Sequence, residues 1–280
     1  MILVFGKTGQ VAQELARLDP GARFLSRTDA DLAAAEACAA AIHTIAPEAV
    51  INAAAWTAVD AAEDNRDAAF ALNGTAPGAM ARACAELGIP FVHISTDYVF
   101  DGSGDTPWRP DDPTAPLSAY GASKLAGEEA VRTAGGLHAI LRTSWVFSAH
   151  GGNFVKTMLR LSETRDHLTI VADQVGGPTP ADAIAAACLE IVRQLEAEPS
   201  KTGTYHFSGA PDVSRADFAR AIFVESGTDV TVEDVPTRAY PAPAVRPLNS
   251  RLDCRTTTAA FGIARPDWRE ALGEILGPRQ

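Results

Sequence analysis

The first twelve residues constrain the fold of this chain more strongly than any other stretch. Residues 2–5 are a short apolar run typical of a buried parallel strand, and a helical pattern follows as far as Leu18. Between them lies Gly6-x-x-Gly9-x-x-Ala12. Glycines there allow a tight turn and a close approach of backbone, and the start of the helix offers free N–H groups and a positive dipole to a pyrophosphate. The position between a strand and a helix favours dinucleotide binding over a purely structural turn.

Strand and helix patterns alternate through the first half of the chain. Further apolar runs typical of buried strands lie at 22–25, 49–55, 90–94 and 139–147. Helical patterns separate them, at 32–45, at 66–87 and from about residue 120 onward. This alternation predicts an α/β fold built on a Rossmann-type, doubly wound parallel sheet.

The alternation loosens beyond residue 143. Strand patterns at 168–171 and 204–207 and helical patterns at 153–163, 181–195 and 215–225 follow in a less regular order. We therefore expect a smaller α/β substrate-binding cap that is interleaved with the sheet. The predicted NAD(P)-binding Rossmann domain comprises residues 1–143 plus about 180–203, and the predicted cap comprises about 144–179 plus 204–280.

The charge of the chain narrows the choice of partner. Its 280 residues carry a formal net charge of −11, which argues against nucleic acid or an anionic membrane as the main partner. No apolar run is long enough for a membrane span, and the N-terminus lacks the features of a signal peptide, so a cytoplasmic location is expected. An anionic ligand needs basic groups placed locally, and the arginines of the predicted cap can supply them.

A tyrosine and a lysine four residues apart, Tyr120 and Lys124, stand at the predicted start of a helix. Positions i and i+4 share a helix face, so the phenol and the ammonium point the same way. A nearby cation lowers the pKa of a tyrosine, which makes the phenol a better proton donor near neutral pH. Such a pair also occurs by chance in surface helices. It becomes a candidate for catalysis because the chain also carries the glycine turn and polar residues at the ends of predicted strands.

Polar side chains follow directly on two of the predicted strands. Thr96, Asp97 and Tyr98 come after the strand at 90–94, and Trp145 lies near the end of the strand at 139–147. The carboxyl ends of parallel strands are where ligands bind in open α/β sheets, so a binding site is favoured over loop capping or a core tryptophan. His93, inside its strand, is interpreted as a packed histidine rather than a base.

The end of the second predicted strand bears on the choice of cofactor. A Rossmann fold usually places an acid there, on the 2′-hydroxyl of the adenosine ribose, whereas this chain has Ser26-Arg27-Thr28. Arg27 can meet the 2′-phosphate of NADPH, although a solvated loop arginine is an equal alternative. Asp31 follows and can hold the adenine side. NADPH is the expected cofactor, with NADH possible.

The glycine turn, the hydroxyl-bearing strand end and the Tyr120–Lys124 pair together resemble the extended short-chain dehydrogenase/reductase superfamily. Within it, longer motifs are similar to the dTDP-4-dehydrorhamnose reductase family, and the resemblance covers nearly the whole chain. These motifs lie, in order, at residues 5–11, 52–60, 95–102, 141–146 and 246–253.

The resemblance implies a reaction and a set of roles. The reaction is NAD(P)H-dependent reduction of the C4 ketone of dTDP-4-dehydro-L-rhamnose to dTDP-L-rhamnose. Tyr120 is implied as the proton donor, Lys124 as the residue that lowers its pKa and binds the nicotinamide ribose, and Thr96 as a partner of the ketone oxygen. The residues implied at the sugar are Thr96, Asp97, Tyr98 and Trp145. The residues expected at the cofactor are Gly6, Gly9, Gln10, Val11, Arg27, Asp31, Leu32, Ala55, Thr57, Tyr120 and Lys124.

Two points stay open at this stage. Some family members join two subunits through magnesium that is held by acidic residues. Glu14 and Asp182 match two of these acids, and no third acid is matched near the C-terminus. The chain is expected to be a monomer or a homodimer.

The rival functions are another nucleotide-sugar epimerase or dehydratase of the same superfamily, which recycles a retained NAD, and a non-catalytic regulatory subunit of the same fold. The intact Thr96, Tyr120 and Lys124 argue against the second.

Overall fold

A parallel sheet of six strands organises the chain, whose computed structural model describes residues 1–277. Its strand order is β10-β5-β4-β3-β1-β2, and every pairing in it is parallel. The strands are β1 (Ile2–Phe5), β2 (Arg23–Leu25), β3 (Ala49–Asn52), β4 (Phe91–Thr96), β5 (His138–Thr143) and β10 (Gly203–His206). The chain moves outward from β1 in one direction to β2 and in the other from β3 to β10, which confirms the predicted doubly wound α/β fold.

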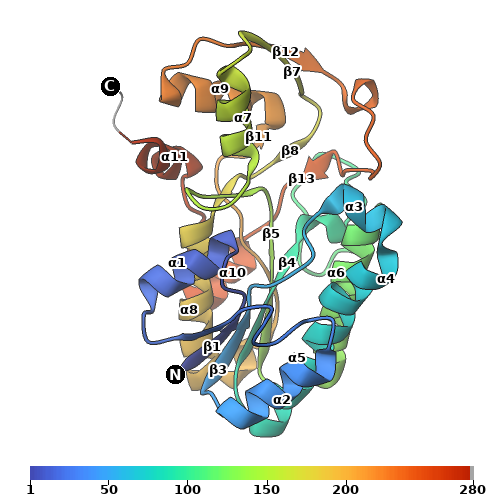
Figure 1. The fold of residues 1–280 in the computed structure, drawn as a ribbon, viewed down its shortest axis with the longest axis vertical. Coiled ribbons are helices and arrows are strands. Elements are labelled where there is room, and N and C mark those ends of the chain that lie inside the picture. The colour runs from blue at the N-terminus through green and yellow to red at the C-terminus, as the bar shows by residue number, and fades with distance from the viewer. Residues whose placement is uncertain (278–280) are drawn as a thin grey trace.

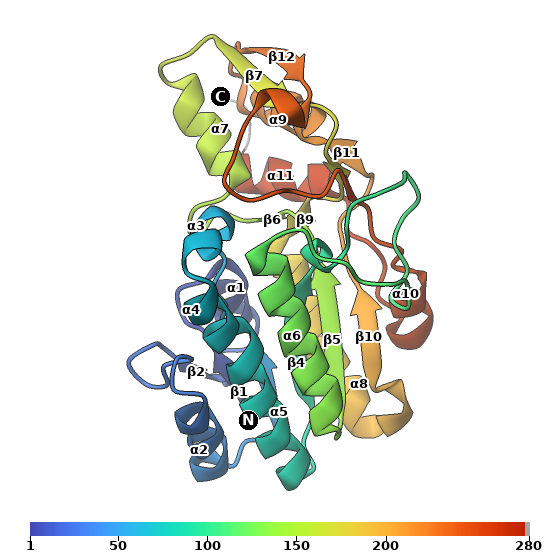
Figure 2. The same cartoon turned by 90° about the vertical axis from the view of Figure 1, so that its right-hand side faces the viewer.

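Helices cover both faces of this sheet (Figures 1 and 2). One face packs against α1 (Gln10–Leu18) and α8 (Ala181–Ala197), and the other against α2 (Ala35–Ile45), α5 (Ala76–Leu87) and α6 (Ala119–Ala134). Successive strand residues point to opposite faces, so Ile51 packs with the first set of helices and Val50 with the second. Burial on both faces explains why these strands are continuous apolar runs.

The helical pattern at 66–87 is divided in the structure. After α3 (Val59–Asp64) come α4 (Arg66–Phe70), a π-helical turn at Ala71–Thr75 and then α5. The π-helical turn places Asn73 so that its amide bonds both backbone groups of Trp56 and also donates to Ser123 Oγ. These hydrogen bonds connect the loop after β3 to the first turns of α6, which carry Tyr120 and Lys124. π-Helical turns are frequent at functional sites.

The cap covers the carboxyl ends of the strands (Figure 1). Its core is formed by the helices α7 (Phe154–Ser162), α9 (Arg215–Ser226) and α11 (Trp268–Leu276), where Phe147, Phe218 and Trp268 are buried together. The short strands are β6 (Val146–Phe147), β7 (His167–Val171), β8 (Val175–Gly176), β9 (Thr179–Pro180), β11 (Val213–Ser214), β12 (Thr231–Val235) and β13 (Asn249–Ser250). None of the helices in the described part of the chain is long and apolar enough to cross a membrane.

The predicted boundary at residue 204 is wrong for strand β10. Residues 204–206 were expected in the cap, but they pair in parallel with β5 and form the edge of the main sheet. The helix α10 (Arg255–Phe261) also packs beside β10 and α8 (Figure 2). An edge strand of four residues has too short a pattern to show which sheet it joins. The remainder of the division into a sheet domain and a cap stays a prediction.

Candidate active site

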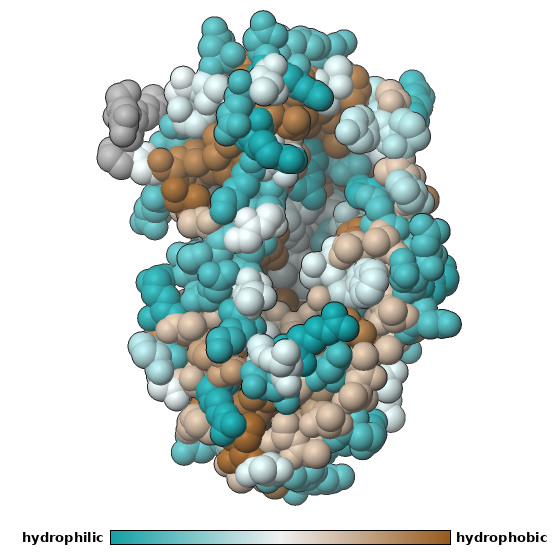
Figure 3. All heavy atoms as spheres, viewed as in Figure 1, coloured by the Kyte–Doolittle hydropathy of each residue, from teal (hydrophilic) through white to brown (hydrophobic). Residues whose placement is uncertain are grey.

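A cavity of about 890 Å³ lies at the carboxyl ends of β1, β3, β4 and β5, and the cap contributes to its wall. The space-filling view shows the molecule hollowed between the sheet domain and the cap (Figure 3). All the residues predicted at the cofactor, the ketone and the sugar line this one cavity. They are Gly6, Gly9, Gln10, Val11, Arg27, Asp31, Leu32, Ala55, Thr57, Thr96, Asp97, Tyr98, Tyr120, Lys124 and Trp145.

The glycine turn forms part of the cavity wall. Gly6 has a φ of +110°, and a Cβ there would meet the Ala53 carbonyl at 3.3 Å, so glycine is required for both conformation and space. Gly9 caps α1 without a side-chain hydrogen bond, and the first intrahelical N–H to be bonded is that of Gln13. The preceding N–H groups are therefore available to a pyrophosphate, so the turn fits a dinucleotide.

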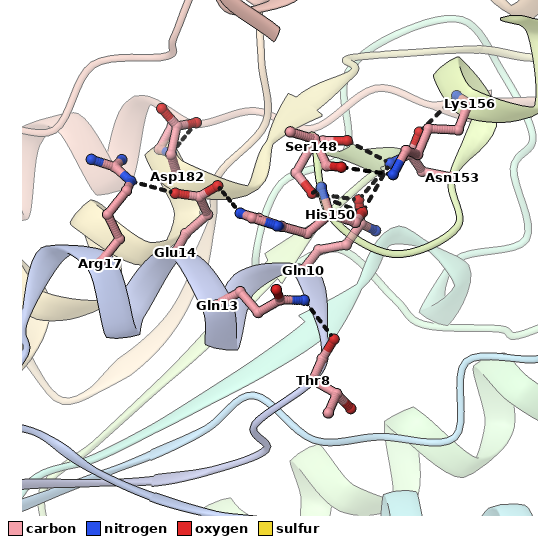
Figure 4. Close-up of polar contacts among 12 residues, drawn as sticks. Thr8, Gln10, Gln13, Glu14, Arg17, Ser148, His150, Asn153, Lys156 and Asp182 are labelled. Carbon is pink, nitrogen blue, oxygen red and sulfur yellow. Dashed lines mark hydrogen bonds and ion pairs between the residues drawn. The ribbon is translucent and has the colours of Figure 1, made fainter.

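The side chain of Gln10 is occupied by the cap (Figure 4). Its Oε1 accepts from Ser148 Oγ at 3.0 Å and from Asn153 Nδ2 at 2.8 Å. Asn153 also caps α7, accepting from Lys156 N at 3.1 Å. The side chain of Gln10 thus joins the cap to the first turn of α1, and its backbone N–H is one of those that the helix leaves unbonded.

The loop after β2 lies beside the glycine turn, since Gly6 N donates to Leu25 O at 3.0 Å, and this is the edge of a Rossmann sheet where adenosine binds. Asp29 accepts from the backbone N and the Oγ of Ser26, which holds the loop after β2 in place. Arg27 pairs with Asp31 at 3.2 Å, and its side chain is 83% exposed. This guanidinium is free to turn toward a phosphate, because its single ion pair is at the surface and therefore weak.

The pair Tyr120–Lys124 lies in the first turns of α6. Ser118 caps this helix, accepting from Gly121 N at 3.2 Å. Gly121 lets α6 approach the end of β4 closely, since a Cβ there would lie 2.2 Å from the Tyr98 carbonyl oxygen. As a result the rings of Tyr98 and Tyr120 meet edge to face, with centroids 5.5 Å apart.

The expectation that Lys124 lowers the pKa of Tyr120 is wrong for this structure. Enclosure by the protein raises the pKa of the Tyr120 phenol, and a hydrogen bond with Thr96 opposes that rise. Lys124 does not act on the phenol because its ammonium is held elsewhere: Nζ donates to the Ile94 carbonyl oxygen at 2.7 Å and lies 3.3 Å from His93 Nε2. The phenol is consequently protonated at neutral pH, as a proton donor must be.

Burial also changes the lysine. Lys124 is 2% exposed, and burial lowers its pKa to about 8. His93, fully buried as predicted, connects it to Asn52, whose amide Nδ2 lies 3.1 Å from His93 Nδ1. Neither Asn52 nor Asn73 was identified from the sequence as part of the site; a polar residue inside an apolar strand was the available signal for Asn52.

The cavity wall near Trp145 holds a buried carboxylate. Asp97 is 2% exposed, and its Oδ1 accepts from Thr96 Oγ1 at 3.1 Å. Its Oδ2 has no hydrogen-bond partner within residues 1–277. Burial raises the pKa of Asp97 to about 6. A buried oxygen without a partner suits a ligand hydroxyl, which would complete its hydrogen bonding.

Trp145 reaches the cavity through an unusual backbone conformation. Its φ is +48°, a region that non-glycine residues seldom adopt. Its indole stacks under the guanidinium of Arg215, whose Cζ is 3.6 Å from a ring centroid. Gly176 leaves room for it, since a Cβ there would lie 3.1 Å from the indole. Sequence reasoning missed Arg215; an arginine directly after the helix cap Ser214 was the signal, because cations are disfavoured at a helix start.

The two acids considered for magnesium lie outside the cavity. Glu14 accepts from Arg17 Nε at 2.8 Å and lies 3.4 Å from His150 Nε2, so a guanidinium and an imidazole already accompany it (Figure 4). Asp182 accepts from its neighbour's N–H at the start of α8. Across the part of the chain that the structure describes, no three histidine, cysteine or acidic side chains form a group that could hold a metal ion. Magnesium held by Glu14 and Asp182 between two subunits stays a prediction.

Comparisons with known proteins agree with this geometry. The family model described as RmlD substrate binding domain matches residues 1–280. A dTDP-4-dehydrorhamnose reductase from Sinorhizobium fredii is 45% identical, covering 98% of this chain and 96% of its own length. The same-named protein of Escherichia coli K12 is 41% identical, covering 98% and 96%.

Solved structures of proteins with this name are also similar to this chain. A dTDP-4-dehydrorhamnose reductase from Clostridium acetobutylicum is similar with a TM-score of 0.92 and 35% identity, covering 98% of each chain. The enzyme of the same name from Bacillus anthracis, in complex with NADP, has a TM-score of 0.91 and 33% identity, covering 98% of this chain and 97% of its own. The chain belongs to the dTDP-4-dehydrorhamnose reductase family.

Proposed function

We propose that this protein reduces the C4 ketone of dTDP-4-dehydro-L-rhamnose to the alcohol of dTDP-L-rhamnose, with NADPH as the reductant. The observation that carries the proposal is that Thr96, Tyr120 and Lys124 line the same cavity as the uncapped glycine turn. The family's shared name supports the substrate, and NADP in the Bacillus anthracis structure supports the cofactor.

The residues present fit a dinucleotide. The free N–H groups behind Gly9 would hold the pyrophosphate, Arg27 would meet the 2′-phosphate, and Ala55 and Thr57 would line the middle of the cofactor. When bound, NADPH supplies the hydride that the C4 carbon accepts. Lys124, which is buried and lines the cavity, would bind a ribose hydroxyl with an N–H that the Ile94 carbonyl leaves free.

The ketone oxygen receives its proton from this chain. Tyr120 donates the phenolic proton as the carbonyl carbon is reduced, so the product is a secondary alcohol and the phenolate must then recover a proton. The Thr96 hydroxyl interacts with the Tyr120 phenol and is therefore in reach of the same oxygen, which it would orient. Asp97, Tyr98 and Trp145 surround this point and would fix the sugar ring over Tyr120.

A turnover assay tests the proposal. Purified protein is mixed with NADPH and enzymatically generated dTDP-4-dehydrorhamnose, and cofactor oxidation and the sugar product are followed. We expect stoichiometric NADP⁺ release and dTDP-L-rhamnose. An epimerase or dehydratase would turn over without net oxidation of added cofactor, and a regulatory subunit would not turn over; either result would refute the proposal. A monomeric or homodimeric state and a cytoplasmic location stay predictions.

A further inference from the structure

Arg215 places a cation in the wall of the active-site cavity, near the buried carboxylate of Asp97 but not in an ion pair with it. It is the first residue of α9 in the cap, it is half-buried, and it lines the cavity. Within residues 1–277, its guanidinium makes no hydrogen bond and no ion pair; only its backbone N–H is bonded, to Gln174 O. Its Cζ lies 3.6 Å from the ring centroid of Trp145 and 5.2 Å from that of Phe154.

In the ligand-free protein, the position of Arg215 makes its charged form unfavourable. Burial lowers the pKa of Arg215 to about 10, so the surroundings disfavour its charged form. The positive end of the α9 dipole repels a cation in the first turn. The neighbouring Arg246 adds repulsion, and it differs from Arg215 in having its own ion pair, with Asp60 at 2.7 Å. Tyr98 and Asp97 favour the charge, but burial outweighs them, so the charge is held here at a net cost. Local rules of this kind are most often broken at functional places.

The stacking on Trp145 determines which atoms of Arg215 are available. A guanidinium lying over an indole uses its face, and its N–H groups remain at the edge of the plane. Cζ lies 3.6 Å from the centroid of the Trp145 ring, and both residues line the cavity, so donors at the edge of the guanidinium are within reach of a ligand there. A planar fork of N–H donors is the arrangement that recognises phosphate oxygens in bidentate fashion.

We propose that Arg215 binds the diphosphate of the sugar nucleotide. The inference rests on the proposed function and names the group that holds the anionic half of its substrate. The cofactor's pyrophosphate has its own place, at the free N–H groups behind Gly9. Arg215 instead stands beside Trp145 and near Tyr98 and Asp97, on the side where the sugar would lie. Its charge then orients the nucleotide away from the cofactor, with the sugar between them.

The test compares binding of dTDP, thymidine and NADPH to wild type, Arg215→Met and Arg215→Lys by calorimetry. Methionine keeps the apolar contact with Trp145 without the charge, and lysine keeps the charge without the planar fork. Arg220→Met is the matched control, since Arg220 lies on the same helix but pairs with Asp217 at 2.9 Å and with Asp234 on the protein surface. Binding needs no turnover, so the result is independent of the catalytic residues.

We expect Arg215→Met to weaken dTDP binding about 10- to 100-fold, the range for charge-assisted hydrogen bonds. Thymidine and NADPH affinities should stay within about twofold of wild type, and Arg215→Lys should recover part of the dTDP affinity. The melting temperature of ligand-free Arg215→Met should equal or exceed that of wild type, because the burial cost of the charge exceeds what Asp97 and Tyr98 return. A structural arginine would give the opposite change.

Three outcomes would overturn the inference. They are unchanged dTDP affinity in Arg215→Met, equal losses for dTDP and thymidine, and a loss confined to NADPH, which would assign Arg215 to the cofactor. The proposed function is judged separately, by turnover of dTDP-4-dehydrorhamnose in wild type. Turnover with unchanged dTDP affinity in the variant refutes only the role of Arg215, whereas absence of both turnover and dTDP binding in wild type refutes both.

Discussion

Lys124 donates from Nζ to the carbonyl oxygen of Ile94 across 2.7 Å, on the strand next to the cavity. This bond holds an ammonium in a place that is 2% exposed, where burial lowers the pKa of Lys124 to about 8 from an ordinary 10.5. Below pH 8 the lysine is charged in both the folded and the unfolded chain, and the folded protein carries the full penalty of burial. Between pH 8 and 10.5 the folded protein loses this proton first, so the penalty fades as pH rises.

Replacing Lys124 by methionine should therefore stabilise the ligand-free protein while it abolishes function. At pH 7 the free energy of unfolding should rise by about 1–3 kcal/mol, and the gain should shrink by pH 10. Urea unfolding at both pH values measures this, with the exposed Lys156→Met as the control, which should change the free energy of unfolding by about 0.5 kcal/mol or less. Destabilisation of Lys124→Met at pH 7 would mean that the Ile94 bond outweighs the burial of charge.

Removal of the Tyr120 hydroxyl should separate chemistry from binding. Tyr120→Phe retains the ring contact with Tyr98, so the fold and the affinity for NADPH should be unchanged. The turnover number should fall by about 10²–10⁴-fold, the usual effect of losing a positioned general acid. Stopped-flow measurement of NADPH oxidation, with NADPH titration as the companion, decides the point. Turnover near that of wild type would remove Tyr120 from the reaction.

Asp97 should set an acid limit on activity. Burial raises its pKa to about 6, so its carboxylate, the form that accepts hydrogen bonds from sugar hydroxyls, is lost as pH falls through that value. The profile of kcat/KM reports groups of the free enzyme, which is the state described by this structure. Wild-type kcat/KM should decline below about pH 6, and Asp97→Asn should be less active without this decline. The control His150→Gln, outside the cavity wall, should keep the decline of kcat/KM below about pH 6. If Asp97→Asn also keeps this decline, a group other than Asp97 causes it.

Much of the site could be predicted because parallel strands share an edge. The turn after β1 and the polar residues after β4 and β5 belong to one sheet, so their carboxyl ends meet in space however far apart they are in sequence. The apolar periodicity and the small residues that follow it showed where those strands end. From these ends we could predict that Gly9, Thr96 and Trp145 would line one cavity.

The remainder depends on tertiary packing that local patterns do not contain. The i, i+4 spacing brings Tyr120 and Lys124 to one helix face, but it says nothing of Ile94, whose carbonyl holds the ammonium away from the phenol. The pKa of a buried group follows from that environment, which is why the predicted lowering for Tyr120 was wrong. Arg215 enters the site from a cap helix whose place over the sheet no periodicity reveals.

The final prediction concerns the preference for NADPH over NADH. The loop after β2 carries no acid at the strand end; Asp29 instead binds Ser26 N and Oγ, which removes it from competition for a ribose hydroxyl. Arg27 lines the cavity, and its ion pair with Asp31 at 3.2 Å is mostly solvated. A 2′-phosphate can replace this weak partner with charge-assisted hydrogen bonds.

We expect wild type to prefer NADPH by about tenfold in kcat/KM, because bonds worth roughly 1.5–3 kcal/mol each are weakened at an exposed guanidinium. The double variant Ser26→Asp/Arg27→Ala should reverse the ratio, since the new carboxylate accepts from the ribose hydroxyls and repels the phosphate. Both cofactors are compared at two salt concentrations, and the wild-type preference should shrink at the higher one. Equal use of the two cofactors by wild type, unchanged in the variant, would show that Arg27 is a solvated loop arginine whose only partner is Asp31.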